Sequence, residues 1–262
     1  MDLGLTGKVA VVTGASKGIG RAVARRLAVE GADAAICARE VTILEATAKE
    51  IAAATGRQCV PIPTDMTRLD QITRLMVEAE RALGRIDILV NNAGASRFGD
   101  PLEIDDDAWS SAMELKFLGY VRATRAVVPY MRKSGWGRIV NVIGSGGVGV
   151  SPVHLPGGSS NAALILFTKG IGLQLARDNI LVNAVSPGGV LTERARRWVQ
   201  ATAEREGKSY DETERAMTGE CALNRFQSPE EVATLVAFLA SERCTFCVGE
   251  NILADGGAVK AI

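Results

Sequence analysis

Lys8-Val-Ala-Val-Val-Thr13-Gly14-Ala-Ser-Lys17-Gly18-Ile19-Gly20 is the stretch that decides the fold of this chain. Residues 9–12 form a short apolar run rich in valine, which predicts a strand buried on both faces. Glycines follow at once, and a helical pattern runs over 21–30. A strand, a glycine turn and a helix start in this order predict a phosphate cradle, because glycines let the backbone come close and the helix end offers free N–H groups. The spacing Gly-x-x-x-Gly-x-Gly is not the usual dinucleotide fingerprint, so on its own it also suits a purely structural turn.

Length and composition predict one large α/β domain over residues 1–262. The chain has 262 residues, 47% of them hydrophobic, and no linker or low-complexity tract divides it. Thirty basic residues balance thirty acidic ones, which argues against nucleic acid or a membrane surface as a partner. No apolar run approaches the roughly 18 to 20 residues of a membrane helix, and the N-terminus lacks a signal core. We therefore expect a cytoplasmic protein.

The cysteines and the single histidine do not predict a metal site. Five cysteines form no disulfide-scaffold pattern in a chain of this length. Cys244 and Cys247 make one Cys-x-x-Cys pair without a second, and His154 is the only histidine. Structural zinc needs more ligands than these, so we predict reduced thiols and no metal.

Strand and helix patterns alternate almost to the end of the chain. Further strands are expected at 34–38, 59–63, 86–90, 138–143, 180–185 and 251–254. Helices are expected at 41–54, 67–83, 162–176 and 229–241, with a long one that starts near the acidic residues 105–107. This alternation predicts a doubly wound parallel sheet with helices on both faces, and a ligand site beyond the carboxyl ends of the strands.

The segment 191–226 breaks this alternation. It is charged, helix-prone and too long for a plain connection. We interpret it as a lid over a substrate; the alternative is a solvated helical insertion.

Several motifs in order resemble the short-chain dehydrogenase/reductase family, with a general likeness to 3-oxoacyl-carrier-protein reductases. They are Thr13–Gly20, Asp65, Asn91–Gly94, Asn183–Gly188 with Thr192, 223–232, and Asp255–Gly257. The resemblance implies reversible hydride transfer between a nicotinamide cofactor and a small carbonyl or alcohol substrate. It also implies a homo-oligomer, a dimer or tetramer, packed through the long fifth and sixth helices. The cofactor-binding residues that it implies are Gly14, Ser16, Lys17, Gly18, Ile19, Gly20, Arg39, Asp65, Met66, Asn91, Ala93, Gly94, Asn161, Pro187, Gly188 and Thr192.

The residues after the second strand favour NADP(H) over NAD(H). An acid at the end of that strand would bind both ribose hydroxyls and repel a 2′-phosphate. Here the place holds Ala38, followed by Arg39, and Lys17 adds a second cation. Such a pair favours the phosphate through charge-assisted hydrogen bonds, unless both are surface cations without a ligand.

This chain departs from the family's pattern at every position that serves proton transfer. By flanking residues, the family's catalytic Tyr and Lys fall at Gly157 and Asn161. The catalytic Ser falls at Gly144, one residue before Ser145, and the Asn of the long helix falls at Lys116.

Three interpretations fit this departure. In the first, the chain is a reductase with substitute groups: His154 is the acid, Lys116 and Asn161 exchange places across the site, and Ser145 binds the substrate oxygen. In the second, the chain binds NADP(H) without turnover, as a sensor or partner subunit. In the third, lyase or hydrolase chemistry uses the same cleft, since a fold does not dictate a function.

Overall fold

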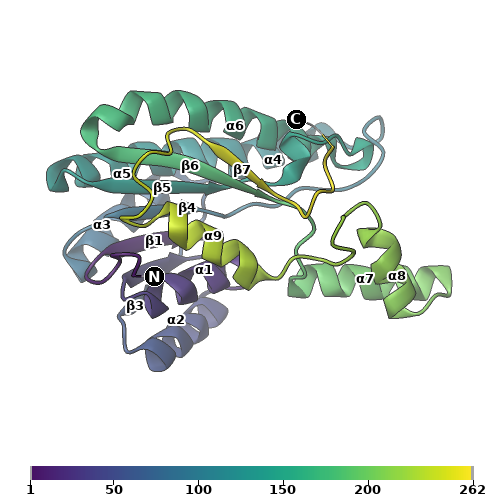
Figure 1. Ribbon diagram of the computed structural model, residues 1–262, viewed down its shortest axis with the longest axis horizontal. Coiled ribbons are helices and arrows are strands. Elements are labelled where there is room, and N and C mark those ends of the chain that lie inside the picture. The colour runs from purple at the N-terminus through teal and green to yellow at the C-terminus, as the bar shows by residue number, and fades with distance from the viewer. Residues whose placement is uncertain (1, 261–262) are drawn as a thin grey trace.

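The computed structural model describes residues 2–260 and contains one sheet of parallel strands in the order β3-β2-β1-β4-β5-β6-β7 (Figure 1). The strands are β1 Val9–Thr13, β2 Asp33–Cys37, β3 Cys59–Pro61, β4 Ile88–Asn91, β5 Gly137–Val142, β6 Ile180–Pro187 and β7 Asn251–Ala254. The order reverses between β1 and β4, which pair with Val12 opposite Val90. This is the topological switch at which such sheets bind ligands, and the predicted fold class is confirmed.

Helices cover both faces of the sheet. They are α1 Gly18–Val29, α2 Val41–Thr55, α3 Leu69–Leu83, α4 Asp106–Ala112, α5 Gly119–Ser134, α6 Leu155–Leu175, α7 Glu193–Glu206, α8 Tyr210–Thr218 and α9 Pro229–Leu239. Helix α1 packs between α2 and α9 on one face of the sheet, and α3, α5 and α6 pack on the other (Figure 1). None of these helices is long and apolar enough to span a bilayer within residues 2–260.

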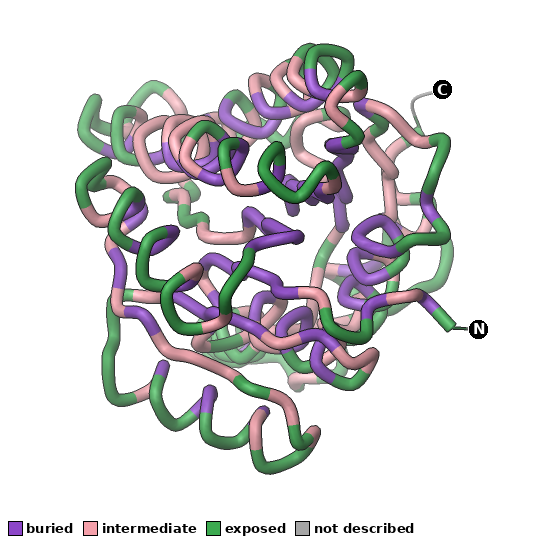
Figure 2. The backbone as a smooth tube through the Cα atoms, turned by 90° about the vertical axis from the view of Figure 1, so that its left-hand side faces the viewer, coloured by how far each residue is buried: buried purple, intermediate pink, exposed green. Residues whose placement is uncertain are grey.

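The two largest apolar clusters of the core lie one on each face of the sheet, and a third, small cluster surrounds Tyr120. Neighbouring residues of β1 serve different clusters, because side chains alternate along a strand. Val12 packs with Leu27 of α1 and the residues of α9, whereas Val11 packs with Leu75 of α3 and Val127 of α5. All five residues of β1 are buried, as its apolar run predicts, and the buried tube of Figure 2 runs through the centre of the fold.

Two helices begin earlier than the sequence pattern predicts. Helix α1 begins at Gly18, so the last glycines of the turn already belong to the helix. Helix α6 begins at Leu155 rather than at residue 162, with Pro156 in its first turn, where the fixed φ of proline suits a helix start. His154 therefore occupies the N-cap position of α6, without a hydrogen bond from its side chain to the helix, and Gly157 lies in the first turn of the helix.

The predicted long helix is divided into three pieces. Asp105 precedes α4, and its side chain accepts a hydrogen bond from the backbone N–H of Ala108, so it caps the helix instead of belonging to its first turn. A π-helical segment, Met113–Leu118, then separates α4 from α5. Such segments are rare and often occur at functional sites. This one carries Lys116.

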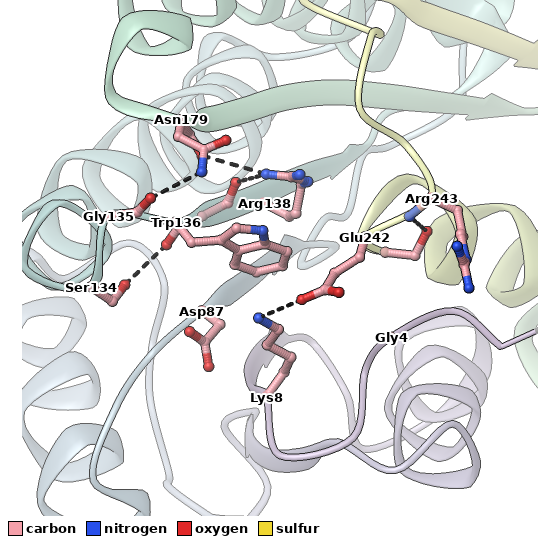
Figure 3. Close-up of polar contacts among 12 residues, drawn as sticks. Gly4, Lys8, Asp87, Ser134, Gly135, Trp136, Arg138, Asn179, Glu242 and Arg243 are labelled. Carbon is pink, nitrogen blue, oxygen red and sulfur yellow. Dashed lines mark hydrogen bonds and ion pairs between the residues drawn. The ribbon is translucent and has the colours of Figure 1, made fainter.

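The amino ends of the central strands are closed by a stacked group of side chains (Figure 3). The Trp136 ring has Lys8 Nζ 4.1 Å and the Arg138 guanidinium 4.4 Å from its centre. Arg138 is buried and donates to the carbonyl of Gly137, and Lys8 pairs with Glu242 at 3.0 Å. This edge is therefore filled by packing, which leaves the carboxyl edge for a ligand.

The segment 191–226 contains α7 and α8, which pack on each other and project from the body of the molecule (Figure 1). Both helices have capped starts. The Thr192 hydroxyl accepts from the Ala195 N–H, and Ser209 and Glu212 form a reciprocal capping box on α8. The segment is thus locally ordered by its own caps, although it shares little surface with the sheet.

Candidate functional site

A cleft of about 610 Å³ lies at the carboxyl ends of the strands. The turns after β1, β2, β4, β5 and β6 all contribute to it, as the switch-point rule requires. Its lining includes Gly14, Ser16, Lys17, Gly18, Ile19, Arg39, Asp65, Met66, Ala93, Gly94, Lys116, His154, Pro187, Gly188 and Thr192. The structure therefore brings together most of the site residues that the sequence predicts.

The glycine turn after β1 brings backbone against backbone. Gly14 has a φ of +65°, and a Cβ there would lie 2.8 Å from the Cα of Ala93. A Cβ on Gly20 would lie 2.4 Å from the carbonyl oxygen of Gly14. Helix α1 then starts without any side chain capping it. Its first N–H groups face the cleft uncapped, so the turn fits an anionic group such as a phosphate.

Asn92 fastens this turn to the next strand. Its side-chain amide donates to the carbonyl oxygens of Thr13 and Gly14, at 3.0 and 3.1 Å. The Thr13 hydroxyl in turn accepts from the backbone N–H groups of Asn92 and Ala93. Asn92 lines the cleft and was missed by the sequence analysis, which selected its neighbour Asn91.

One end of the cleft lies beyond β2 and is lined by four charged residues. Hydrogen bonds from Thr67 keep the pKa of Asp65 below its usual value, with Arg39 helping, so its carboxylate is charged at neutral pH. Lys17 pairs with Glu40 at 3.7 Å, an acid that the sequence analysis did not consider. Arg39 lines the same end and makes no ion pair within residues 2–260. Lys17 is therefore already paired with an acid, whereas Arg39 is not paired within these residues.

The other end of the cleft lies beyond β5, and we call it the β5 end: Ile143, Gly144, Lys116, His154 and Arg194. Lys116 reaches it from the π-helical segment and donates a hydrogen bond to the carbonyl oxygen of Ile143. Burial lowers the pKa of Lys116 to about 8, because the charged ammonium is poorly solvated there.

The His154 ring fills the space above Gly157. A Cβ on Gly157 would lie 2.2 Å from His154 Nε2, so the imidazole stands where a side chain at 157 would begin. The ring also stacks on Phe98, with 4.1 Å between centroids and 12° between planes. Burial lowers the pKa of His154, and the nearby charges of Lys116 and Arg194 lower it further. The imidazole is therefore mostly neutral at pH 7.

Gly144 and Asn161 pack together at the end of β5. Gly144 has a φ of +136°, which side chains rarely tolerate, and a Cβ there would lie 3.1 Å from Asn161 Nδ2. Asn161 is only 2% exposed, and its Oδ1 has no hydrogen-bond partner among the described residues. Lys116 bonds to Ile143 and Asn161 packs against Gly144, so both reach the end of β5.

Four of the predicted site residues do not line the cleft: Gly20, Asn91, Ser145 and Asn161. Gly20 and Asn161 are packed directly behind it, as described above. Asn91 is buried and donates to Asn141 Oδ1 at 2.9 Å, because it points to the opposite side of β4 from Asn92. Ser145 begins a 3₁₀ turn after Gly144 and makes no contact that directs it into the cleft.

Helix α7 contributes residues that the sequence analysis did not single out. Arg194 and Arg197 both line the cleft. The two arginines are three residues apart in the helix that follows Thr192, so they lie on one helix face. This spacing is a signal that could have found them.

Comparisons with known proteins agree along nearly the whole chain. Residues 8–203 match the short chain dehydrogenase family. A 3-oxoacyl-(acyl-carrier-protein) reductase of Aquifex aeolicus is 34% identical over 98% of this chain and 99% of its own length. A 2,3-dihydro-2,3-dihydroxybenzoate dehydrogenase of Bacillus subtilis is 36% identical over 99% and 98%.

The fold is also close to a solved structure. The crystal structure of L-sorbose reductase from Gluconobacter frateurii, complexed with NADPH and L-sorbose, superposes with a TM-score of 0.97 at 33% identity, covering both chains completely. With the glycine turn, the strand order and the cleft at the switch point, these likenesses show that the chain belongs to the short-chain dehydrogenase family.

Proposed function

We propose that the protein is an NADP(H)-dependent oxidoreductase that interconverts a small carbonyl compound and its alcohol through an atypical proton-transfer site. The observation that carries the proposal is the placement of His154: its imidazole stands in the space over Gly157, inside the cleft. An ionisable group thus occupies the place where the family's phenol would begin.

The cleft fits an NADP cofactor by its own chemistry. The uncapped start of α1, with Gly18 and Ile19, would hold the pyrophosphate, and Arg39 would hold the 2′-phosphate. Asp65 would meet the adenine, and Thr192 and Pro187 would hold the nicotinamide end. The solved L-sorbose reductase is complexed with NADPH, and a relative from Bacillus subtilis is named an NADPH-dependent reductase, which supports this choice. The bound cofactor supplies or accepts the hydride.

The chain's own residues would manage the proton and the charge. We assign His154 as the group that gives a proton to the substrate oxygen in reduction and takes it back in oxidation. Lys116, protonated below pH 8, would stabilise negative charge that develops on that oxygen. Asn161 would position the Gly144 turn, and Ser145 is a further candidate contact for the substrate oxygen.

Turnover tests this proposal. Incubation with NADPH and a panel of ketones, aldehydes and quinones should consume the reduced cofactor. The His154→Ala variant should lose activity by about two to four orders of magnitude, the usual contribution of a general acid. Undiminished turnover in this variant would remove His154 from the role. Tight NADPH binding without turnover of any substrate would instead favour a silent sensor or partner subunit, and product formed without a change in NADPH would favour lyase or hydrolase chemistry.

The cofactor preference has a separate test, in dissociation constants measured by calorimetry. Arg39→Ala should weaken NADPH binding by about tenfold or more and leave NADH binding unchanged, because only NADPH carries the 2′-phosphate. Glu40→Gln should have the opposite effect on NADPH affinity: it removes the acid that pairs with Lys17, so NADPH should bind more tightly. Tighter binding of NADH than of NADPH by the unaltered protein would contradict the assignment.

We further propose that residues 191–226 act as a lid on one domain that spans 1–262. The support is that α7 places Arg194 and Arg197 over the cleft while packing mainly on α8. An element with few contacts to the sheet can move when a substrate enters.

A further inference from the structure

We propose that the substrate carries a carboxylate, which the arginine face of α7 binds at the β5 end of the cleft, with Arg194 as the main contact. This inference rests on the proposed function and names the substrate class for the same site.

The first observation is an excess of positive charge around the β5 end. Lys116 and Arg194 line the cleft there, and Arg197 lines the cleft from the same helix as Arg194; none of the three forms an ion pair within the described part of the chain. Glu193, the residue before Arg194, is an acid that also lines the cleft. Elsewhere on the surface arginines pair readily, as Arg225 does with Glu231 at 2.7 Å. Cations left without an acid inside a cleft indicate an anionic ligand.

The second observation is the position of Arg194. Its Nη2 donates to the carbonyl oxygen of Ser96 at 3.3 Å, which holds the guanidinium beside the loop that follows β4. The charge of Arg194 is close enough to His154 to lower its pKa. Arg194 therefore stands next to the proposed proton donor, where part of the substrate must lie. The guanidinium keeps further N–H groups for a carboxylate, which it can bind with two parallel hydrogen bonds.

The third observation is a side cavity of about 540 Å³ that shares Arg194 and Ala95 with the cleft. Ser111 and Ala112 of α4 form part of its wall, together with Asp107 and with Asp105, which pairs with Arg97 at 2.9 Å. Space therefore continues past Arg194, so a substrate can place its carbonyl at the β5 end and its carboxylate against Arg194.

The cofactor's own phosphates do not account for Arg194. The pyrophosphate is assigned to the uncapped start of α1, and the 2′-phosphate to Arg39 beyond β2. Arg194 contacts Ser96 and influences His154, both at the opposite end of the cleft.

Paired substrates test the inference in turnover. The unaltered enzyme with NADPH should reduce 4-carboxybenzaldehyde with a higher kcat/KM than methyl 4-formylbenzoate, the same aldehyde without the charge. Arg194→Gln should lower the ratio of kcat/KM for the acid to kcat/KM for the ester by about tenfold or more, since a hydrogen bond to a charged group contributes that much. The effect of the lost charge on the pKa of His154 is shared by both substrates and cancels in this ratio. Arg196→Gln is the matched control: Arg196 is on the same helix and exposed, but it does not line the cleft, so neither substrate should respond. The inference would be overturned if the ester were reduced as well as the acid, or if Arg194→Gln left the acid-to-ester ratio of kcat/KM unchanged. Either result would leave the proposed function standing.

Binding without turnover gives the independent arm. Calorimetry on the enzyme saturated with NADP⁺ should detect benzoate and give a much weaker signal for benzamide, and Arg194→Gln should abolish the difference. If benzoate binds in this way but no aldehyde is turned over, the anion site is supported and the proposed function is contradicted. Equal binding of benzoate and benzamide would count against the anion site.

Discussion

At the scale of single residues, the β5 end of the cleft works through what its side chains do to one another. Burial lowers the pKa of Lys116 to about 8, and the lysine's remaining charge helps to lower the pKa of His154. The two groups therefore ionise on either side of neutral pH. A neutral base and a protonated lysine coexist between those two pKa values, which suits removal of a proton from an alcohol.

The pH dependence of alcohol oxidation follows from these two pKa values. The rate should rise as His154 loses its proton, below its usual value of about 6.5, and should fall as Lys116 loses its charge above about pH 8. The measurement is kcat/KM against pH with NADP⁺ and an alcohol substrate. Lys116→Arg should move the alkaline decline upward, because arginine stays charged. An unchanged alkaline limb in that variant would show that another group causes it.

The contact between His154 and Gly157 can be tested by stability. Glycine-to-alanine changes inside helices usually stabilise, but here the added methyl group would collide with the imidazole. We expect Gly157→Ala to lower the free energy of unfolding by about 1–2 kcal/mol. In the His154→Ala background the same change should become neutral or stabilising. Chemical denaturation of the two single variants and the double variant measures the coupling, and strictly additive effects would place the ring elsewhere.

At the scale of elements, the two capping boxes stabilise different parts of the molecule. Helix α9 packs on α1 and contributes to the core, whereas α8 packs mainly on α7 and lies outside it. Ser228 caps α9 with Glu231, and Ser209 caps α8 with Glu212. The same local motif therefore supports the core in one place and the lid in the other.

Alanine at each cap should separate these roles. Ser228→Ala should lower the global free energy of unfolding by about 1 kcal/mol. Ser209→Ala should leave global unfolding nearly unchanged and raise amide hydrogen exchange within 193–218, because the lid can open without the core. Denaturant titration and hydrogen exchange read the two effects. A loss of global stability from Ser209→Ala as large as that from Ser228→Ala would mean that lid and core unfold together.

At the scale of the whole molecule, the outer surface of α6 carries exposed apolar side chains. Leu166 is 77% and Leu173 63% exposed, and they lie two turns apart on one helix face. The family resemblance implies packing between copies through the long fifth and sixth helices, and such a surface suits a second copy of the chain. We therefore propose a homo-oligomer that uses α6.

Charge on this face should dissociate the oligomer. Leu166→Asp should shift the molar mass measured by light scattering toward the monomer, because it would bury a carboxylate at the contact. Leu102→Asp is the control: Leu102 is 94% exposed but precedes α4, away from this face. A mass unaffected by Leu166→Asp, in a protein that is oligomeric, would place the contact on another surface.

Most of the fold, and the meeting of most of the predicted cofactor residues in one cleft, could be predicted because they depend on local chemistry. The apolar run of β1, the glycines after it and the alternation of helices and strands are each readable within a few residues. Only a residue without a side chain fits at Gly14 and Gly20, so the turn is visible in the sequence itself.

The sequence by itself determined the parallel sheet, the glycine turn and the place of the cleft, since periodicity and turn residues act over short distances. Only the tertiary structure decided how the two ends of the cleft are built. The ring of His154 over Gly157, the pairing of Lys17 with Glu40, and Arg194 beside Ser96 join segments that are distant or differently oriented. Such contacts depend on where a helix begins and which way a side chain points, and no short pattern of residues encodes either.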